Sequence, residues 1–362
     1  MNILGIESSC DDTSVSLVED GYKIRSLVSQ SQYIAHEKFS GVVPEIASRE
    51  HLKAILPTCK AAIQQANVSL NDIDAIAVTT QPGLIGSLVV GVNFAKGLAY
   101  KLKKPIIPVN HLLAHIYAAF FENKIEFPLL ALLISGGHTA IVMMQSFFEY
   151  TILGKTLDDS CGEAFDKIAK YFNLGYPGGP IIDKFAQKGN SNAYNFPITL
   201  VDVKKYGANF SFSGLKTAVI HFRKKYKNID SIVEESHEES VEDIVASFQK
   251  TMVDTLLLKT KYAIDQTGIK KLIIAGGSSA NSEIRTRFNL LKKNGIEIYF
   301  PPSNLCTDNG AMVAGLAYHI FAQEYLKDID SFSSFDFQNY RFPFELNPQS
   351  RTPDFGKRQH KY

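Results

Sequence analysis

The chain has 362 residues, of which 45% are hydrophobic and 21% charged, as in a folded globular protein with room for two domains. Its formal net charge of +1 excludes a polycation, so any contact with nucleic acid must come from local basic patches. The four cysteines form no CxxC pair, which argues against a disulfide framework and fits a reducing compartment. Without a signal-like N-terminus or an apolar run of membrane-spanning length, the sequence predicts a cytoplasmic protein with no membrane partner.

The N-terminal part predicts three short strands followed by alternating helices and strands. The strands are expected at 2–6, 14–18 and 22–28, with Asp20-Gly21 as the turn of a hairpin. They are followed by a long helix at 44–67, a strand at 75–80, a helix at 84–102 and a strand at 105–109.

The same order begins again near residue 128, with strands expected at 128–135, 140–145 and 150–154. Helices are expected at 161–172, 211–225, 241–266 and 278–294, and a strand at 271–275. The repeated order predicts an internally duplicated, two-lobed α/β protein, although such units are common enough to recur by coincidence. We expect a first lobe at 1–127 with a final helix at about 307–326 packing back on it, a second lobe at 128–306 and an extended tail at 327–362.

His111 and His115 are four residues apart, so on a helix they share one face. The pair is a weak signal by itself, because buried or surface pairs without a metal are common. A metal site needs a third ligand, and Asp308, at a loop-to-helix junction, is the best candidate. A zinc peptidase would need a glutamate at the position of Leu112, so the pair predicts a metal clamp without the hydrolytic base.

Two turns indicate phosphate binding. In SGGHT (135–139) the glycines let the backbone approach a ligand, and the N–H groups can cradle a phosphate, although an ordinary tight hairpin fits as well. ESSCDDT (7–13) is the equivalent turn of the first lobe. Two such turns facing each other across a central cleft favour a nucleotide site.

Four positions of the second lobe are candidates for holding a nucleoside: Asp166, Gly179, Asp183 and Asn281. A carboxylate beside a glycine loop can bind ribose hydroxyls, although ordinary caps and turns are the alternative. AGGSSAN (275–281) follows a strand, so its glycines allow a flat ring to lie on the backbone. It is not a GxGxxG fingerprint, and the chain has no GxxxxGK[ST], which disfavours dinucleotide and P-loop sites.

Ten stretches resemble one family in order and cover roughly residues 2 to 320: GIESSCDDTS, GVVPEIASREH, QPGLIGSLVVG, NHLLAH, LLISGGHTAIV, DDSCGEAFDKIAK, YPGGPIID, NFSFSGLKTA, AGGSSAN and CTDNGAMVA. They are similar to the universal tRNA adenosine N6-threonylcarbamoyltransferase family (TsaD), once labelled O-sialoglycoprotein endopeptidase. GVVPEIASREH resembles its bacterial or organellar branch. The chain departs from the pattern at Leu113, where an acidic residue is frequent, at Ser278 and Ser279, in an acidic insert around 234–243, and in the tail.

The resemblance implies the duplicated two-lobed fold of sugar kinases, actin and the heat-shock ATPases, with a central cleft. It implies one divalent ion, Fe(II) first and Zn(II) second, held by His111, His115 and Asp308. The phosphate and acyl part of the substrate would lie at Ile134, Ser135, Gly136, Gly137 and His138. The adenosine would be held by Asp166, Gly179, Asp183 and Asn281.

The implied reaction transfers threonylcarbamoyl from threonylcarbamoyl-AMP to N6 of the adenosine at position 37 of tRNAs that read ANN codons, and releases AMP. Asp11, in the first-lobe turn, is our hypothesis for proton removal. Besides tRNA and the adenylate, the implied partners are a non-catalytic TsaB-like paralogue and a small TsaE-like ATPase. Two alternatives remain open. A sugar-kinase-like phosphotransferase would need a carboxylate-bound metal, and a non-catalytic nucleotide-binding scaffold would have lost the HxxxH and SGGHT residues.

Overall fold

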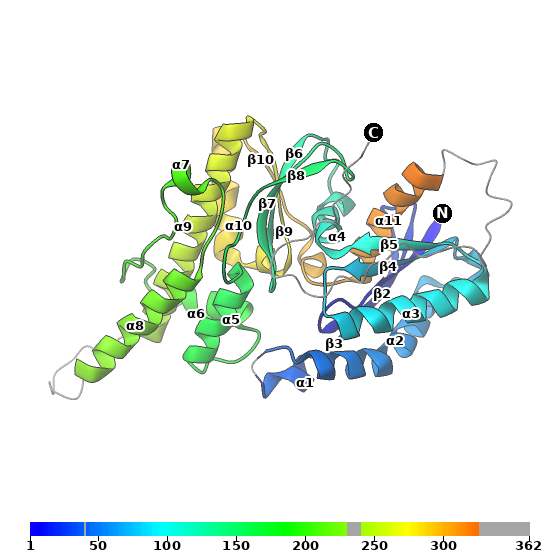
Figure 1. Cartoon of the computed structure of the whole chain (residues 1–362), viewed down its shortest axis with the longest axis horizontal. Coiled ribbons are helices and arrows are strands. Elements are labelled where there is room, and N and C mark those ends of the chain that lie inside the picture. The colour runs from blue at the N-terminus through cyan, green and yellow to red at the C-terminus, as the bar shows by residue number, and fades with distance from the viewer. Residues whose placement is uncertain (40, 230–239, 326–362) are drawn as a thin grey trace. The chain divides into compact units, whose positions relative to one another are not determined.

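The computed structural model describes residues 1–39, 41–229 and 240–325, and the chain divides into two compact units (Figure 1). Unit 1 comprises Met1–Lys124 and the segment from Pro301 onward, and unit 2 comprises Ile125–Phe300. The expected tail at 327–362 and most of the acidic insert at 234–243 lie outside the described residues. Among the helices that are described, none is both long and apolar enough to cross a membrane.

Unit 1 contains a five-stranded sheet in the order β3-β2-β1-β4-β5. The first three strands pair antiparallel, whereas β1, β4 and β5 run parallel. The strands are β1 (Asn2–Glu7), β2 (Asp12–Glu19), β3 (Lys23–Ser31), β4 (Ala75–Gln81) and β5 (Ile106–Asn110). The helices are α1 (Tyr33–Glu37), α2 (Pro44–Ala66), α3 (Ile85–Leu102), α4 (His111–Tyr117) and α11 (Gly310–Tyr325), with short 3-10 turns η1 (Leu70–Asp72), η2 (Ala118–Phe121) and η5 (Ser303–Leu305).

Helices cover both faces of this sheet, which explains why β1 and β4 are nearly continuous apolar runs. On one face, Leu4 and Ile6 belong to a core with residues of α2 and α3 such as Ile55 and Val92. On the other face, α11, which is orange in Figure 1, packs on β1 and β2. A Cβ on Gly5 would lie 2.2 Å from the carbonyl oxygen of Gly310, so this contact requires glycine. The close approach brings the start of α11 to the carboxyl end of β1.

Unit 2 repeats the topology with the strand order β10-β9-β6-β7-β8. Here β6, β7 and β8 pair antiparallel, and β6, β9 and β10 run parallel. The strands are β6 (Leu129–Ile134), β7 (Thr139–Met144), β8 (Tyr150–Lys155), β9 (Lys271–Ala275) and β10 (Glu297–Tyr299). The helices are α5 (Cys161–Tyr171), α6 (Gly178–Ala186), α7 (Val203–Tyr206), α8 (Ser213–Ile229), α9 (Val241–Thr267) and α10 (Ser282–Asn289), with η3 (Gly277–Ala280) and η4 (Leu290–Asn294).

The two sheets have the same order and the same strand directions, with β6, β7, β8, β9 and β10 in the places of β1, β2, β3, β4 and β5. The predicted duplicated two-lobed α/β fold is therefore confirmed. The core of unit 2 lies between its sheet and the helices α5, α8, α9 and α10, where Phe165 packs edge-on against Phe248.

One predicted helix was wrong in its extent. The expected helix at 278–294 begins at Ser282, because the side chain of Asn281 accepts a hydrogen bond from the backbone N–H of Ile284 and caps α10. The preceding residues form η3 instead. Gly276 has a φ of +91°, and a Cβ there would lie 2.5 Å from the carbonyl oxygen of Ile134. The backbone of the loop after β9 therefore packs closely against the end of β6.

Candidate functional site

His111 and His115 lie at the start of α4, immediately after β5. Asn110 caps this helix, since its side chain accepts hydrogen bonds from the backbone N–H groups of Leu112 and Leu113. His111 and His115 therefore occupy one face of the first turn, with ring centroids 4.5 Å apart in an edge-on arrangement. Both are buried, with 7% and 1% of their surface exposed.

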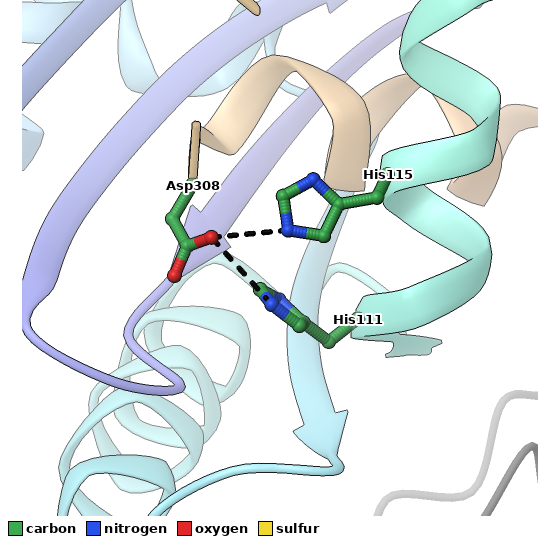
Figure 2. A group of neighbouring side chains, drawn as sticks. All are labelled: His111, His115 and Asp308. Carbon is green, nitrogen blue, oxygen red and sulfur yellow. Dashed lines mark hydrogen bonds and ion pairs between the residues drawn. The ribbon is translucent and has the colours of Figure 1, made fainter. Parts of the chain in front are cut away.

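Asp308 meets the two histidines from the loop that precedes α11. Its Oδ1 lies 3.1 Å from Nε2 of His115 and 3.6 Å from Nε2 of His111. Figure 2 shows both rings projecting from α4 toward this carboxylate. The loop is held by Asn309, whose side chain caps α11 at Met312, and by the N–H of Gly310, which donates to the Oγ of Ser14.

The donor set fits a divalent first-row metal ion. One ligand atom from each of His111, His115 and Asp308 lies within 4.8 Å of the others. Two donors bound about 2.1 Å from a tetrahedral ion are themselves about 3.4 Å apart, which is close to the 3.1 and 3.6 Å that separate Oδ1 of Asp308 from the two Nε2 atoms. Two imidazole nitrogens and one carboxylate suit Fe(II) or Zn(II) and leave coordination positions for a substrate.

Glu7, which the sequence reasoning did not single out, orients His111. It ends β1, has no exposed surface, and places its Oε2 3.0 Å from Nδ1 of His111. The N–H of Ser9 and the hydroxyl of Thr79 also donate to this carboxylate, each at 2.6 Å. An ionised carboxylate only accepts hydrogen bonds, so in the neutral ring of His111 Nδ1 carries the proton and Nε2 is the nitrogen that could ligate a metal ion.

The charges of this pair support each other. Burial by itself would raise the pKa of Glu7, but the charge and hydrogen bond of His111 outweigh it and hold that pKa below its ordinary value. Burial would likewise lower the pKa of His111, but Glu7 and Asp308 raise it to about 9. The only sequence signal for Glu7 was a charged residue at the end of an otherwise apolar strand in ESSCDDT.

The position that would hold the base of a zinc peptidase is part of the core. Leu112 is fully buried, so no carboxylate stands beside His111 on α4. His115 lacks a counterpart of Glu7, because its buried Nδ1 has no hydrogen-bond partner in the described part of the chain. The two imidazoles are therefore held differently, and only His111 has its tautomer set by a carboxylate.

Asp11 lies in the turn between β1 and β2, in the same unit as His111, His115 and Asp308. Burial and the nearby charge of Asp308 raise its pKa above the ordinary value. The neighbouring Asp12 behaves alike, since burial, Asp308 and Asp11 raise its pKa to about 7. A carboxylate with a raised pKa is a stronger base. The role of Asp11 as the proton acceptor stays a prediction.

In unit 2, the expected phosphate turn joins β6 to β7. Its ends are closed by hydrogen bonds between Ser135 and His138, and the hydroxyl of Ser160 donates to the carbonyl of Gly136 at 2.6 Å. Within the described chain, the N–H groups of Gly136 and Gly137 donate to no other residue, and a Cβ on either glycine would meet open space. Ile134 has a fully buried side chain, so it can offer only its backbone.

The expected nucleoside residues lie on two neighbouring parts of unit 2. Asp166 on α5 accepts a hydrogen bond at 2.7 Å from the N–H of Gly178, the first residue of α6, and Gly179 faces open space. Asp183 on α6 accepts hydrogen bonds from the N–H and hydroxyl of Ser282, next to Asn281. The structure thus joins α6 to the start of α10 through Asp183.

A family profile described as TsaD: tRNA N6-adenosine threonylcarbamoyltransferase matches residues 23–315. A tRNA N6-adenosine threonylcarbamoyltransferase from Borreliella afzelii (strain PKo) is 49% identical over 341 residues, which is 94% of this chain and 96% of that protein. A protein of the same name from Brachyspira hyodysenteriae (strain ATCC 49526 / WA1) is 48% identical over 336 residues, which is 92% of this chain and 96% of that protein.

Solved structures with similar folds are much more distant in sequence. Component A of the Acidaminococcus fermentans (R)-2-hydroxyglutaryl-CoA dehydratase has a TM-score of 0.54 at 15% identity, over 89% of this chain and 99% of that chain. Full-length HypF has a TM-score of 0.55 at 14% identity, over 88% of this chain and 46% of that chain. These structures support the fold alone. The profile match and the relatives, at 49% and 48% identity, show that the chain belongs to the tRNA N6-adenosine threonylcarbamoyltransferase family.

Proposed function

We propose that this protein transfers threonylcarbamoyl from threonylcarbamoyl-AMP to N6 of the adenosine at position 37 of tRNAs that read ANN codons, with release of AMP. We further propose that the reaction depends on a divalent metal, Fe(II) first and Zn(II) as the alternative. The observation that carries this is the convergence of His111, His115 and Asp308 in a chain of this family, with Glu7 fixing the tautomer of His111. The family assignment gives no support to a phosphotransferase or a non-catalytic scaffold.

The proposed chemistry forms one bond and breaks another. The N6 lone pair attacks the carbamoyl carbon, the bond from that carbon to the phosphate oxygen breaks, and AMP leaves with the electron pair. When bound, the metal would supply a Lewis acid that orients the mixed anhydride and favours departure of AMP. An aromatic amine is a weak nucleophile, so positioning should provide much of the rate.

The residues of the chain have distinct parts in this proposal. Asp11 would take the proton lost by N6, a role that its raised pKa suits. The N–H groups of the turn at 135–138 would hold the phosphate and acyl part, since two of them donate to no other described residue. Asp166, Gly179, Asp183 and Asn281 would hold the adenosine.

We also propose the partners that the resemblance implies: a TsaB-like paralogue without catalytic function and a small TsaE-like ATPase. A separate enzyme would supply the adenylate. These partners bear on the assay, because the transferase could be inactive without them.

The test is transfer of labelled threonine to unmodified tRNA, with the adenylate-forming enzyme and both partners supplied. We expect wild type to label the tRNA and His115→Ala to do so at least a hundredfold more slowly, with loss of bound metal measured by mass spectrometry. His221→Ala is the matched control, because His221 is an exposed histidine on α8. Its rate and metal content should equal those of wild type.

Two results would overturn the proposal. Unlabelled tRNA with wild type, under conditions in which a relative labels it, would overturn the transferase. Full activity of His115→Ala after metal removal would overturn the metal dependence and leave the transferase assignment in place. Asp11→Asn tests the proton acceptor separately, and an unchanged single-turnover rate would exclude that role.

A further inference from the structure

We infer that Gln249 is a positioning residue that fixes the side chains of Asp183 and Asn281 for the adenosine of the donor. The inference rests on the proposed function, because it takes these two residues as the adenosine ligands. Gln249 lies in the first third of α9 and is only 4% exposed. A glutamine inside a long amphipathic helix belongs to no motif, so no sequence pattern selects it.

Gln249 bridges two residues that are 98 positions apart in the sequence. Its Nε2 donates to Oδ1 of Asp183 at 3.2 Å, and its Oε1 accepts from Nδ2 of Asn281 at 2.8 Å. Both of its polar groups are therefore used, one on α6 and one at the start of α10. An unpaired donor or acceptor on this buried amide would destabilise the folded protein. Position 249 therefore requires a side chain that both donates and accepts a hydrogen bond.

In the series of hydrogen bonds that links Asp183, Gln249 and Asn281, the donor and the acceptor of each bond are fixed. The backbone N–H of Ile284 can only donate, so the side-chain group of Asn281 that faces it is the oxygen. The amide nitrogen of Asn281 then faces Gln249, whose oxygen must accept, and the nitrogen of Gln249 must face Asp183. An ionised carboxylate accepts this last bond. The helix cap of α10 thereby sets the orientation of all three side chains.

The network leaves a defined set of groups for a ligand. A carboxylate offers about four acceptor positions, and Asp183 uses two on Oδ1 and one on Oδ2, where the N–H of Ser282 donates. One acceptor position remains on Oδ2, which suits a ribose hydroxyl. Asn281 keeps one N–H of its amide, which suits an acceptor on the base or the sugar. Asp183 is half-buried, so its remaining position can be reached.

The experiment measures the KM for the adenylate donor and the KM for tRNA, in the complete transfer system. Gln249→Met keeps the length of the side chain but neither donates nor accepts. We expect it to raise the KM for the donor about tenfold and to leave the KM for tRNA unchanged. Thr255→Val is the matched control, because it removes one buried hydrogen bond of α9 that goes only to the carbonyl of Thr251. It should lower the melting temperature comparably and change neither KM.

A second pair of variants keeps the test decisive if Gln249→Met does not fold. Gln249→Glu still accepts from Asn281 but cannot donate to Asp183, so the KM for the donor should rise. Adding Asp183→Asn places an amide donor opposite the carboxylate that Gln249→Glu introduces. The KM of the double variant for the donor substrate should then be lower than that of Gln249→Glu alone, which a purely structural role would not predict. An unchanged KM in the Gln249 variants, with active wild type, overturns this inference only. Inactive wild type overturns the proposed function and this inference with it.

Discussion

Replacing Glu7 with glutamine should move the proton of His111 onto Nε2, the nitrogen that faces the proposed metal site. In wild type, the carboxylate of Glu7 accepts from three donors: the N–H of Ser9, the hydroxyl of Thr79 and Nδ1 of His111. An amide has only one oxygen. The N–H of Ser9 can only donate to Oε1, so in Glu7→Gln the oxygen stays there and the NH₂ group takes the place of Oε2.

This NH₂ group faces Thr79 and His111. The hydroxyl of Thr79 can rotate to accept, but His111 can accept at Nδ1 only if its proton moves to Nε2. A proton on Nε2 blocks the nitrogen that lies 3.6 Å from Asp308. Loss of such a partner of a metal-bound histidine typically costs 10- to 100-fold in metal affinity, or about 1.4 to 2.7 kcal/mol.

The assay is an anaerobic competition titration of Fe(II) and of Zn(II) against a chelating dye, with the folded state checked by its melting temperature. Thr79→Val is the matched control, because it removes one hydrogen bond to Glu7 and leaves the charged carboxylate on His111. We expect the control to lose less than about threefold in affinity. A Glu7→Gln protein that is folded and binds either metal within twofold of wild type would refute the tautomer argument.

Four further outcomes can be measured. Chelation of the metal should lower the melting temperature of wild type but not of His115→Ala, because a ligand that binds only the folded state stabilises it. Asp158→Ala should destabilise the protein by about 1 kcal/mol in urea unfolding, because Asp158 accepts hydrogen bonds from the backbone N–H groups at the start of α8. Gly276→Ala alone should destabilise the protein more than Asp158→Ala does, because φ at this position is +91° and the new Cβ would lie 2.5 Å from the carbonyl oxygen of Ile134. A melting temperature equal to that of wild type would contradict this. Burial lowers the pKa of His319 from 6.5 to about 4, so between these pH values the unfolded chain takes up a proton that the folded chain does not. The free energy of unfolding should therefore fall as the pH drops from about 6.5 toward 4. In His319→Gln, the urea midpoint should depend less on pH in that window.

The sequence determined the elements and their repetition, because both follow from local patterns. Short apolar runs bounded by polar turns predicted the five strands of the first sheet and four strands of the second, and the recurrence of strand, turn, strand and strand near residue 128 predicted the duplication. The misplaced start of α10 has a local cause too. Asn281 can lie inside a helix or cap one, and its hydrogen bond to the N–H of Ile284 made it the cap.

The histidine spacing likewise determined that the two imidazoles share one turn of α4. It did not determine the third ligand, since Asp308 is 193 positions from His115. That meeting depends on the close packing of Gly5 against Gly310, which seats α11 on β1.

Glu7 and Gln249 show most clearly what cannot be predicted from the sequence alone. Each is one polar residue in an apolar strand or an amphipathic helix, and its type alone gives no partner. Only the tertiary structure decides that Glu7 meets His111 and that Gln249 meets Asp183 and Asn281. The physical reason is that a buried polar group must pair, but the pairing partner is chosen by the packing of elements far apart in the chain.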